Sequence, residues 1–315
     1  MISLRARFQK SFTRHVLRPR LSPAATVQQQ RWWLDKLAGL ALLPWGCKTQ
    51  NVDCDGVPAE WVSVGNVPNS PVLLYLHGGG YCIGSPQSHR NVVARLAKGL
   101  GCRALVPDYR LAPEHPFPAP LLDVVQVYRW LLAQGVAPQQ IVLAGDSAGG
   151  GLALALCMML RQLGVPLPAA LFCISPWVDL SLSCASIEKL ADIDPLVEVA
   201  WIESLASHYC AGEDPRHPLI SPLYGHFDDF PPILIQLGSE EVLRSEVELL
   251  HARLQHAGVA SRLQVGEGMW HDWPLLGGMM PEADLAIRQA VAFITERLGM
   301  EQVNAAFMPA PSIAG

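Results

Sequence analysis

Short apolar runs alternate along the chain with longer stretches of helical spacing. The apolar runs lie at residues 72–76, 102–107, 141–145, 169–174 and 233–238, with a weaker one at 261–265. The helical stretches lie at residues 88–100, 121–134, 152–160, 245–256 and 282–298. Strands of a parallel sheet are apolar throughout because helices cover both of their faces. The pattern therefore predicts an α/β fold with a mostly parallel central sheet and helices on both faces.

Two segments depart from this rhythm. Residues 1–50 come before the first strand signals, which begin with a turn at 53–58 and an alternating stretch at 59–64. Residues 178–230 are helix-like around 195–209 and rich in proline further on. We interpret residues 178–230 as an insertion that stands over the ends of the strands.

The composition of the chain argues against several functions. The chain has 315 residues, half of them hydrophobic, and a net charge of -5, so it offers no basic stripe for nucleic acid. Eight cysteines are scattered without Cys-x-x-Cys spacing, which favours buried thiols in a reduced, cytoplasmic protein over disulfides or zinc. A P-loop, the dinucleotide glycine fingerprint and a His-Glu-x-x-His pattern are missing from the sequence. We expect no metal and no cofactor.

The N-terminal segment is basic. Its first 34 residues contain seven arginines and lysines and no acid, and no apolar core suitable for a secretory signal follows the charges. Three interpretations stay open: a transit peptide, a basic helix on a membrane surface, and a helix packed over the main domain. Every later apolar run is interrupted by Gly, Pro or a charge, so we expect no membrane span.

A nucleophile elbow is indicated where the apolar run at 141–145 meets Gly145-Asp146-Ser147-Ala148-Gly149 and a helical stretch follows. A serine on so tight a turn is exposed to a reactant, and the flanking glycines leave room for the neighbouring chain. The first N–H groups of the helix also face the serine, so Ala148 is a natural donor to an oxyanion.

A second glycine motif follows the buried run at 72–76, where the sequence is His77-Gly78-Gly79-Gly80. Consecutive glycines at the end of a strand let backbone N–H groups approach a ligand closely. We expect the N–H groups of Gly78 and Gly79 to complete an oxyanion hole with Ala148. His77 is expected to orient this loop by hydrogen bonds.

The serine needs a base, and the base needs an orienting acid. His271 lies on a loop after the last strand signal and is the best candidate for the base, whereas Asp272 is expected to be a solvated or turn-forming residue. Glu240 and Glu241 follow the preceding strand, and either could be the acid. The order of nucleophile, acid and histidine is the one expected of an α/β-hydrolase.

The segment between the predicted strand at 102–107 and the next helix is rich in proline. Within it, Arg110 is expected to form a buried bidentate pair with Asp108 or Glu114.

These motifs, with Tyr109-Arg110-Leu111-Ala112-Pro113-Glu114-His115-Pro116, resemble those of the bacterial hormone-sensitive-lipase-like esterases of the α/β-hydrolase fold. The resemblance covers roughly residues 30 to 298 and implies a helical cap, ester hydrolysis without a cofactor, and often homodimers. That family commonly has Asp-Pro-Leu at the acid, and matching it places Glu241-Val242-Leu243 in register, which favours Glu241 over Glu240.

The resemblance divides the chain into five parts. They are an N-terminal cap segment (1–50), the first part of the catalytic domain (51–177), a cap insertion (178–230), the second part of the catalytic domain (231–300) and a flexible tail (301–315). A lidded pocket predicts small-molecule ester substrates with short to medium acyl chains. Tyr81, Trp177 and Trp201 are the candidate pocket walls.

Two other functions use the same features. An amidase or peptidase would need the same triad, and a binding protein of this fold, like the plant gibberellin receptors, would have lost the base. A histidine, His271, is present at the position of the base, and its presence favours an enzyme over a binding protein.

Overall fold

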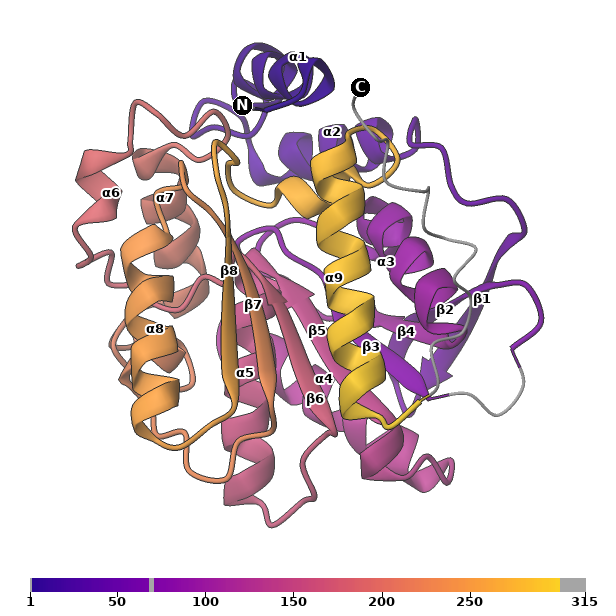
Figure 1. Cartoon of the computed structure of the whole chain (residues 1–315). Coiled ribbons are helices and arrows are strands. Elements are labelled where there is room, and N and C mark those ends of the chain that lie inside the picture. Colours follow the sequence, from indigo (N-terminus) through magenta and orange to yellow (C-terminus); the bar gives the residue numbers. More distant parts are fainter. Residues whose placement is uncertain (1, 68–70, 301–315) are drawn as a thin grey trace.

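The structure, a computed structural model, describes residues 2–67 and 71–300 and is built around one sheet of eight strands (Figure 1). In sequence order the strands are β1 (Cys47–Cys54), β2 (Val57–Val64), β3 (Val72–Leu76), β4 (Arg103–Pro107), β5 (Ile141–Asp146), β6 (Ala170–Ile174), β7 (Ile233–Gly238) and β8 (Ser261–Gly266). Their spatial order is β1-β2-β4-β3-β5-β6-β7-β8. The fold class predicted from the sequence is confirmed.

The sheet is parallel from β4 to β8 and antiparallel at its first two strands. All residues of β3, β5, β6 and β7 are buried, as their apolar sequences predict. Because these strands run in one direction, their carboxyl ends meet at one edge of the sheet.

The pattern of apolar runs misses β1. This strand begins at Cys47, inside the segment that the sequence assigns to the N-terminal cap. Most of its residues are exposed and polar, because it is the outermost strand and pairs only with β2. The sequence of an exposed edge strand therefore contains no continuous apolar run by which it could be predicted.

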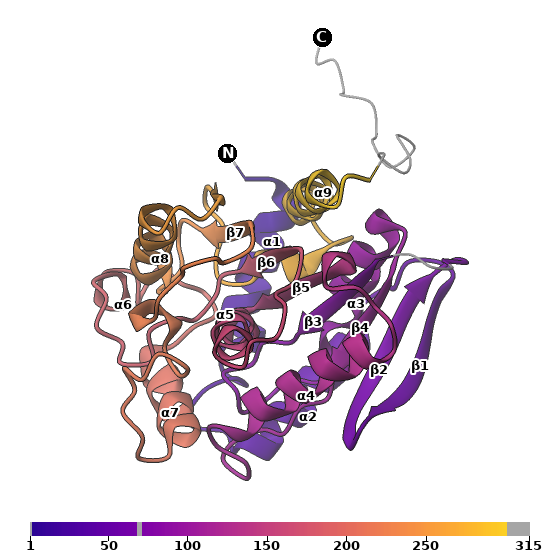
Figure 2. The ribbon, with the colours of Figure 1, turned by 90° about the horizontal axis from the view of Figure 1, so that it is seen from below.

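Helices cover both faces of the sheet (Figure 2). One face packs against α4 (Ala119–Ala133), α5 (Ser147–Gln162) and α8 (Arg244–His256), and the other against α3 (Pro86–Leu100) and α9 (Pro281–Arg297). Short helical turns η2 (Pro138–Gln140), η3 (Pro222–Tyr224) and η4 (Trp273–Leu276) lie in the connections. The apolar surfaces of helices and sheet form two core layers.

The remaining helices lie away from the two faces of the sheet. They are α1 (Leu4–Phe12), the π-helical turn η1 (Thr13–Leu17), α2 (Val27–Ala38), α6 (Ser186–Lys189) and α7 (Val199–Cys210). Figure 1 shows α1 and α2 at the end of the molecule where α3, α5 and α9 begin. A hydrogen bond of 2.8 Å from Trp201 Nε1 to Gln30 Oε1 links α7 to α2.

Arg31 ties α2 to the main domain. Its side chain donates to the carbonyls of Cys82 and Ala112 and pairs with Glu114 at 2.7 Å. The N-terminal segment is therefore packed against the domain. None of the helices in residues 2–67 and 71–300 combines the length and apolar character that a bilayer span requires. The predicted tail, 301–315, lies outside the described residues.

Candidate active site

The turn from β5 into α5 presents Ser147 to the pocket. Ser147 has a φ of 49°, a left-handed conformation that non-glycine residues rarely adopt. A side chain at Gly145 would place its Cβ 2.5 Å from the carbonyl oxygen of Gly149 and 2.8 Å from that of Leu76. Glycine is therefore required beside the serine, as a nucleophile elbow demands.

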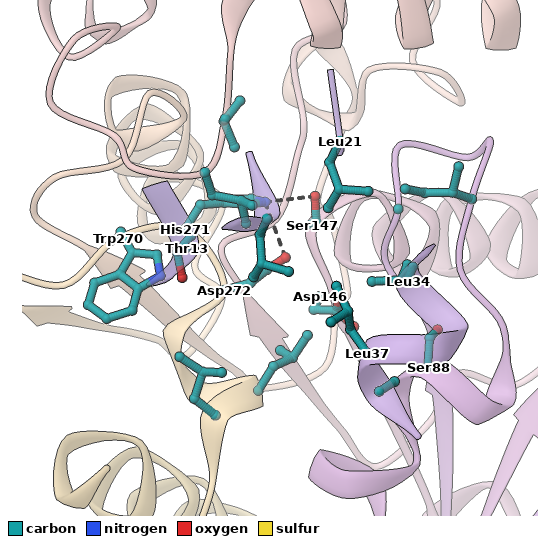
Figure 3. A pocket seen from close by; sticks show the side chains of 18 of the residues that line it. Thr13, Leu21, Leu34, Leu37, Ser88, Asp146, Ser147, Trp270, His271 and Asp272 are labelled. Atoms are coloured by element: carbon teal, nitrogen blue, oxygen red, sulfur yellow. Dashed lines mark hydrogen bonds and ion pairs between the residues drawn. The ribbon is translucent and has the colours of Figure 1, made fainter. Parts of the chain in front are cut away.

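His271 contacts the serine from the loop between β8 and η4. Its Nε2 lies 3.0 Å from Ser147 Oγ, a hydrogen-bond distance, and both side chains are buried (Figure 3). On the other side of the ring, Nδ1 lies 3.5 Å from Glu241 Oε2. The three residues thus form one chain of contacts across the ends of β5, β7 and β8.

The two candidate acids lie in different environments. Glu241 is completely buried, and its Oε2 accepts a hydrogen bond of 2.6 Å from Ser175 Oγ. Glu240 is partly exposed and forms an ion pair with Lys10 of α1. Only Glu241 faces the histidine. Ser175, which directly follows β6 and has a φ of 42°, is a positioning residue that sequence reasoning missed, although a serine just after a buried strand is a usable signal.

The structure corrects the expectation that the side chain of Asp272 is solvated. Instead of being solvated, its carboxyl group lines the pocket, and its Oδ2 lies 3.2 Å from His271 Nε2. Its backbone N–H points at Ser175 Oγ at 3.3 Å. With a φ of 59°, Asp272 does form a tight turn, and that turn directs the side chain inward. A second carboxylate therefore contacts the histidine nitrogen that faces Ser147.

The acidic neighbours determine the charge of His271. Burial by itself lowers the pKa of its ring, but the close, negatively charged carboxylates of Asp272 and Glu241 raise it by more. The pKa of His271 therefore lies well above its ordinary value. These carboxylates stabilise the imidazolium form, which is the form that appears when histidine accepts a proton from serine.

The glycine loop differs in detail from the prediction. The amide nitrogen of Gly78 lies 3.3 Å from His89 Nε2, inside the protein, and Gly78 does not line the pocket. Gly79 and Gly80 do line it, with φ values of 113° and 59° that favour glycine. Within the described residues, the N–H groups of Gly79, Gly80 and Ala148 form no hydrogen bond. The available donors are therefore one position later in the loop than the sequence suggests.

A buried polar group that sequence reasoning missed stands beneath the serine. The carboxyl group of Asp146 accepts a hydrogen bond of 2.7 Å from Tyr75 Oη and lies 3.1 Å from His89 Nε2. Burial opposes its charge, but the charge of His89 and the hydrogen bonds from both partners bring the pKa of Asp146 below its ordinary value. Asp146 is thus a fixed anion between the elbow and the glycine loop.

His77 orients the glycine loop and is neutral. Its Nδ1 lies 2.9 Å from the carbonyl oxygen of Gly78, and its ring stacks on that of Tyr109 at 4.2 Å. Burial, and next the charge of His89, lowers the pKa of His77 to about 3. With so low a pKa and no hydrogen bond to Ser147 among the described residues, His77 cannot replace His271 as the base.

The pocket above the serine is small and mostly apolar. Its volume is about 240 Å³, and α1, η1, α2 and α7 supply much of its wall. Trp177 and Trp201 line it, as predicted from the sequence, but Tyr81 does not. Tyr81 is buried behind the wall, where its ring stacks on that of Tyr209 at 3.8 Å. In the described part of the chain, His, Cys, Asp and Glu side chains form no cluster suited to a metal ion.

Comparison with known proteins agrees with this architecture. The family model described as alpha/beta hydrolase fold matches residues 73–275, and the chain belongs to this family. Within it, the chain groups with the bacterial hormone-sensitive-lipase-like esterases. A crystal structure of an esterase from that bacterial family superposes with a TM-score of 0.91 and 40% identity, covering 95% of this chain and 100% of the other.

Curated relatives carry related names. An acetyl-hydrolase of Streptomyces hygroscopicus is 44% identical over 76% of this chain and 80% of its own length. An ethyl acetate hydrolase of Pseudomonas putida is 32% identical over 72% of this chain and 73% of its own length. The family predicted from the sequence is confirmed.

Proposed function

We propose that this esterase hydrolyses short-chain carboxylic esters with Ser147 as the nucleophile, His271 as the base and Glu241 as the orienting acid. The observation that carries the proposal is the 3.0 Å contact between Ser147 Oγ and His271 Nε2, with the buried carboxylate of Glu241 on the opposite side of the ring. An unassisted serine hydroxyl is a weak nucleophile, and this arrangement supplies what it lacks.

The reaction takes place in two acyl-transfer steps. Ser147 Oγ attacks the ester carbonyl while His271 Nε2 accepts its proton, and Glu241 stabilises the imidazolium through Nδ1. The imidazolium then donates its proton to the departing alcohol, which leaves an acyl group on Ser147. Water, deprotonated by His271, attacks the acyl-enzyme. The imidazolium then returns this proton to Ser147 Oγ as the carboxylic acid is released.

The oxyanion is held by the N–H groups of Gly79, Gly80 and Ala148. No hydrogen bond is formed by any of these three N–H groups within the described residues, and the two glycines line the pocket beside Ser147. One donor of this kind typically contributes 100- to 1,000-fold in rate, roughly 3–4 kcal/mol. Gly80 takes the role first assigned to Gly78.

Residues 1–50 and 178–230 act as the cap that limits the substrate. Phe12, Leu17 and Leu37 from the first segment and Trp201 and Leu205 from the second line the pocket. Their side chains are apolar and suit an acyl chain. A cavity of about 240 Å³ lies below the usual range for larger ligands, roughly 300–1,000 Å³, so acetyl and butyryl groups fit best.

Hydrolysis of p-nitrophenyl butyrate by single variants tests the triad. Ser147→Ala and His271→Ala should each lower kcat by about 1,000-fold or more, and Glu241→Gln by about 100-fold or more. Glu240→Gln is the matched control and should change kcat by less than about twofold, because it removes only a partly exposed ion pair that does not contact the histidine. Full activity of Ser147→Ala would refute the mechanism. Faster cleavage of a matched p-nitroanilide would identify an amidase instead.

A further inference from the structure

Exposed apolar side chains are concentrated near the N-terminus. Among the described residues, seven of the thirteen large hydrophobic side chains that are exposed lie between Leu4 and Trp45. They are Leu4, Phe8, Trp32, Leu40, Leu42, Leu43 and Trp45. Single exposed apolar residues are ordinary, but seven in a segment of about 40 residues indicate a contact surface.

Helix α1 turns an apolar stripe toward solvent. Leu4 and Phe8 are one helical turn apart on the same face and are 80% and 66% exposed. The opposite face buries Ala6 in a cluster with Trp270. This orientation is the reverse of the one expected when apolar residues of a surface helix pack inward.

Arginines stand on both sides of the stripe. Arg5 and Arg7 are exposed, and neither forms an ion pair within the described residues. Other cations of the segment point inward, since Lys10 pairs with Glu240 and Arg14 donates to backbone carbonyls. The outward face of α1 is therefore apolar in its centre and cationic at its edges.

The exposed apolar residues border the pocket. Gln9, which follows Phe8, lines the pocket, and so does Ala41, which lies between Leu40 and Leu42. Leu40 and Leu42 are 78% and 85% exposed. Figure 1 shows α1 and α2 at the same end of the molecule, above the end of the sheet where α3, α5 and α9 begin. Exposed leucines and a phenylalanine are thus the immediate sequence neighbours of residues in the pocket wall.

We propose that the N-terminal patch, consisting of Leu4, Arg5, Arg7, Phe8, Leu40 and Leu42, docks on the surface of an anionic phospholipid bilayer. An apolar helix face edged by arginines matches the boundary between acyl chains and anionic headgroups. The charge distribution agrees, because the first 34 residues hold seven bases and no acid although the whole chain is net -5. The docked enzyme presents its pocket to the lipid.

A second copy of the chain fits this patch less well. In a two-fold dimer the same patch lies on both subunits, so the arginines of one copy would face the apolar and cationic surface of the other. Juxtaposed like charges oppose that contact, whereas anionic headgroups neutralise them. The homodimer implied by the family resemblance stays a separate prediction.

Cosedimentation with lipid vesicles tests the docking. The full chain carrying Ser147→Ala, which should consume no lipid, is mixed with phosphatidylcholine vesicles that contain either no anionic lipid or about one third phosphatidylglycerol. We expect binding at least about tenfold tighter to the anionic vesicles, weakening with added salt. Leu4→Ser with Phe8→Ser, and Arg5→Glu with Arg7→Glu, should each reduce this binding by about tenfold or more.

Leu122→Ser with Leu249→Ser is the matched control, because these leucines are equally hydrophobic, 49% and 47% exposed, and lie on α4 and α8. It should bind like the parent. Equal binding by all variants, or no preference for anionic vesicles, would overturn the proposal. Light scattering that shows a dimer, and its dissociation by Phe8→Ser, would also overturn it. The patch variants, made without Ser147→Ala, should keep their activity on dissolved p-nitrophenyl butyrate, which verifies folding. Vesicle binding needs no catalysis, so its failure is distinguishable from failure of the proposed mechanism.

Discussion

At the scale of single residues, the unusual feature of the site is that one nitrogen serves two partners. His271 Nε2 lies 3.0 Å from Ser147 Oγ and 3.2 Å from Asp272 Oδ2. A neutral His271 can accept the serine proton at Nε2, but a protonated Nε2–H is held by the Asp272 carboxylate. Asp272 therefore favours the inactive, protonated histidine in the resting enzyme.

This geometry predicts the effect of Asp272→Asn on the pH profile. The base must be neutral, so kcat/KM rises as pH increases through the pKa of His271. Asp272 raises that pKa, and its replacement by an uncharged isostere should lower it. The rising limb of kcat/KM should shift to lower pH, and the ratio of activity at pH 6 to activity at pH 9 should increase several-fold.

Full pH profiles with p-nitrophenyl acetate measure this shift. Glu240→Gln serves as a control, because it removes a nearby negative charge that does not contact the histidine. An unchanged rising limb in Asp272→Asn, with activity otherwise retained, would show that Asp272 does not act on His271.

At the scale of elements, the turn from β5 into α5 is the most constrained connection in the site. Backbone carbonyls from β3 and α5 surround Gly145 within 2.5–2.8 Å of where a Cβ would lie. Backbone cannot move aside as a flexible side chain can. Only glycine fits at position 145, and this allows the tight turn that presents Ser147 to the substrate.

Gly145→Ala should therefore destabilise the fold by about 1–3 kcal/mol or more, through strain at the turn. Gly39→Ala is the matched control, because its φ is ordinary and the nearest atom to its Cβ would lie 3.4 Å away. Alanine there should change stability by less than about 1 kcal/mol. Urea unfolding of the two variants gives both values, and equal stability would contradict the packing argument.

At the scale of the whole molecule, the pocket is assembled from segments far apart in the sequence. Its wall includes Phe12 near the N-terminus, Trp201 in the middle of the chain and Met279 near α9. No single segment encloses a substrate. The preference for acyl-chain length therefore depends on how the cap segments pack on the sheet.

Replacing a wall residue should change that preference. The wild type should hydrolyse acetyl and butyryl p-nitrophenyl esters faster than octanoyl and palmitoyl esters, because the cavity is small. Phe12→Ala should raise the octanoyl to butyryl ratio of kcat/KM several-fold by enlarging the pocket. Phe8→Ala, on the same helix but outside the pocket, should leave the ratio unchanged. A maximum with the palmitoyl ester would contradict a small pocket.

Local patterns predict those features that depend on neighbours in the chain. Continuously apolar runs identify β3 and β5 to β7, because parallel strands are buried on both faces, and the glycines at 145 and 149 identify the tight turn at Ser147. The α/β-hydrolase fold and the family follow from these patterns and are confirmed. The catalytic roles of Ser147, His271 and Glu241 stay predictions.

Contacts between distant segments could be decided only by the tertiary structure. Adjacent glutamates look alike in sequence, yet Glu241 is buried behind His271 while Glu240 pairs with Lys10, more than 200 residues away. Arg110 pairs with Asp123 on α4 at 2.7 Å, not with Asp108 or Glu114, and its side chain is half exposed. The sequence by itself determines the buried parallel strands, the elbow and the family. The choice of donor in the glycine loop, the inward turn of Asp272 and the cap around the pocket depend on packing, because long-range contacts leave no local pattern.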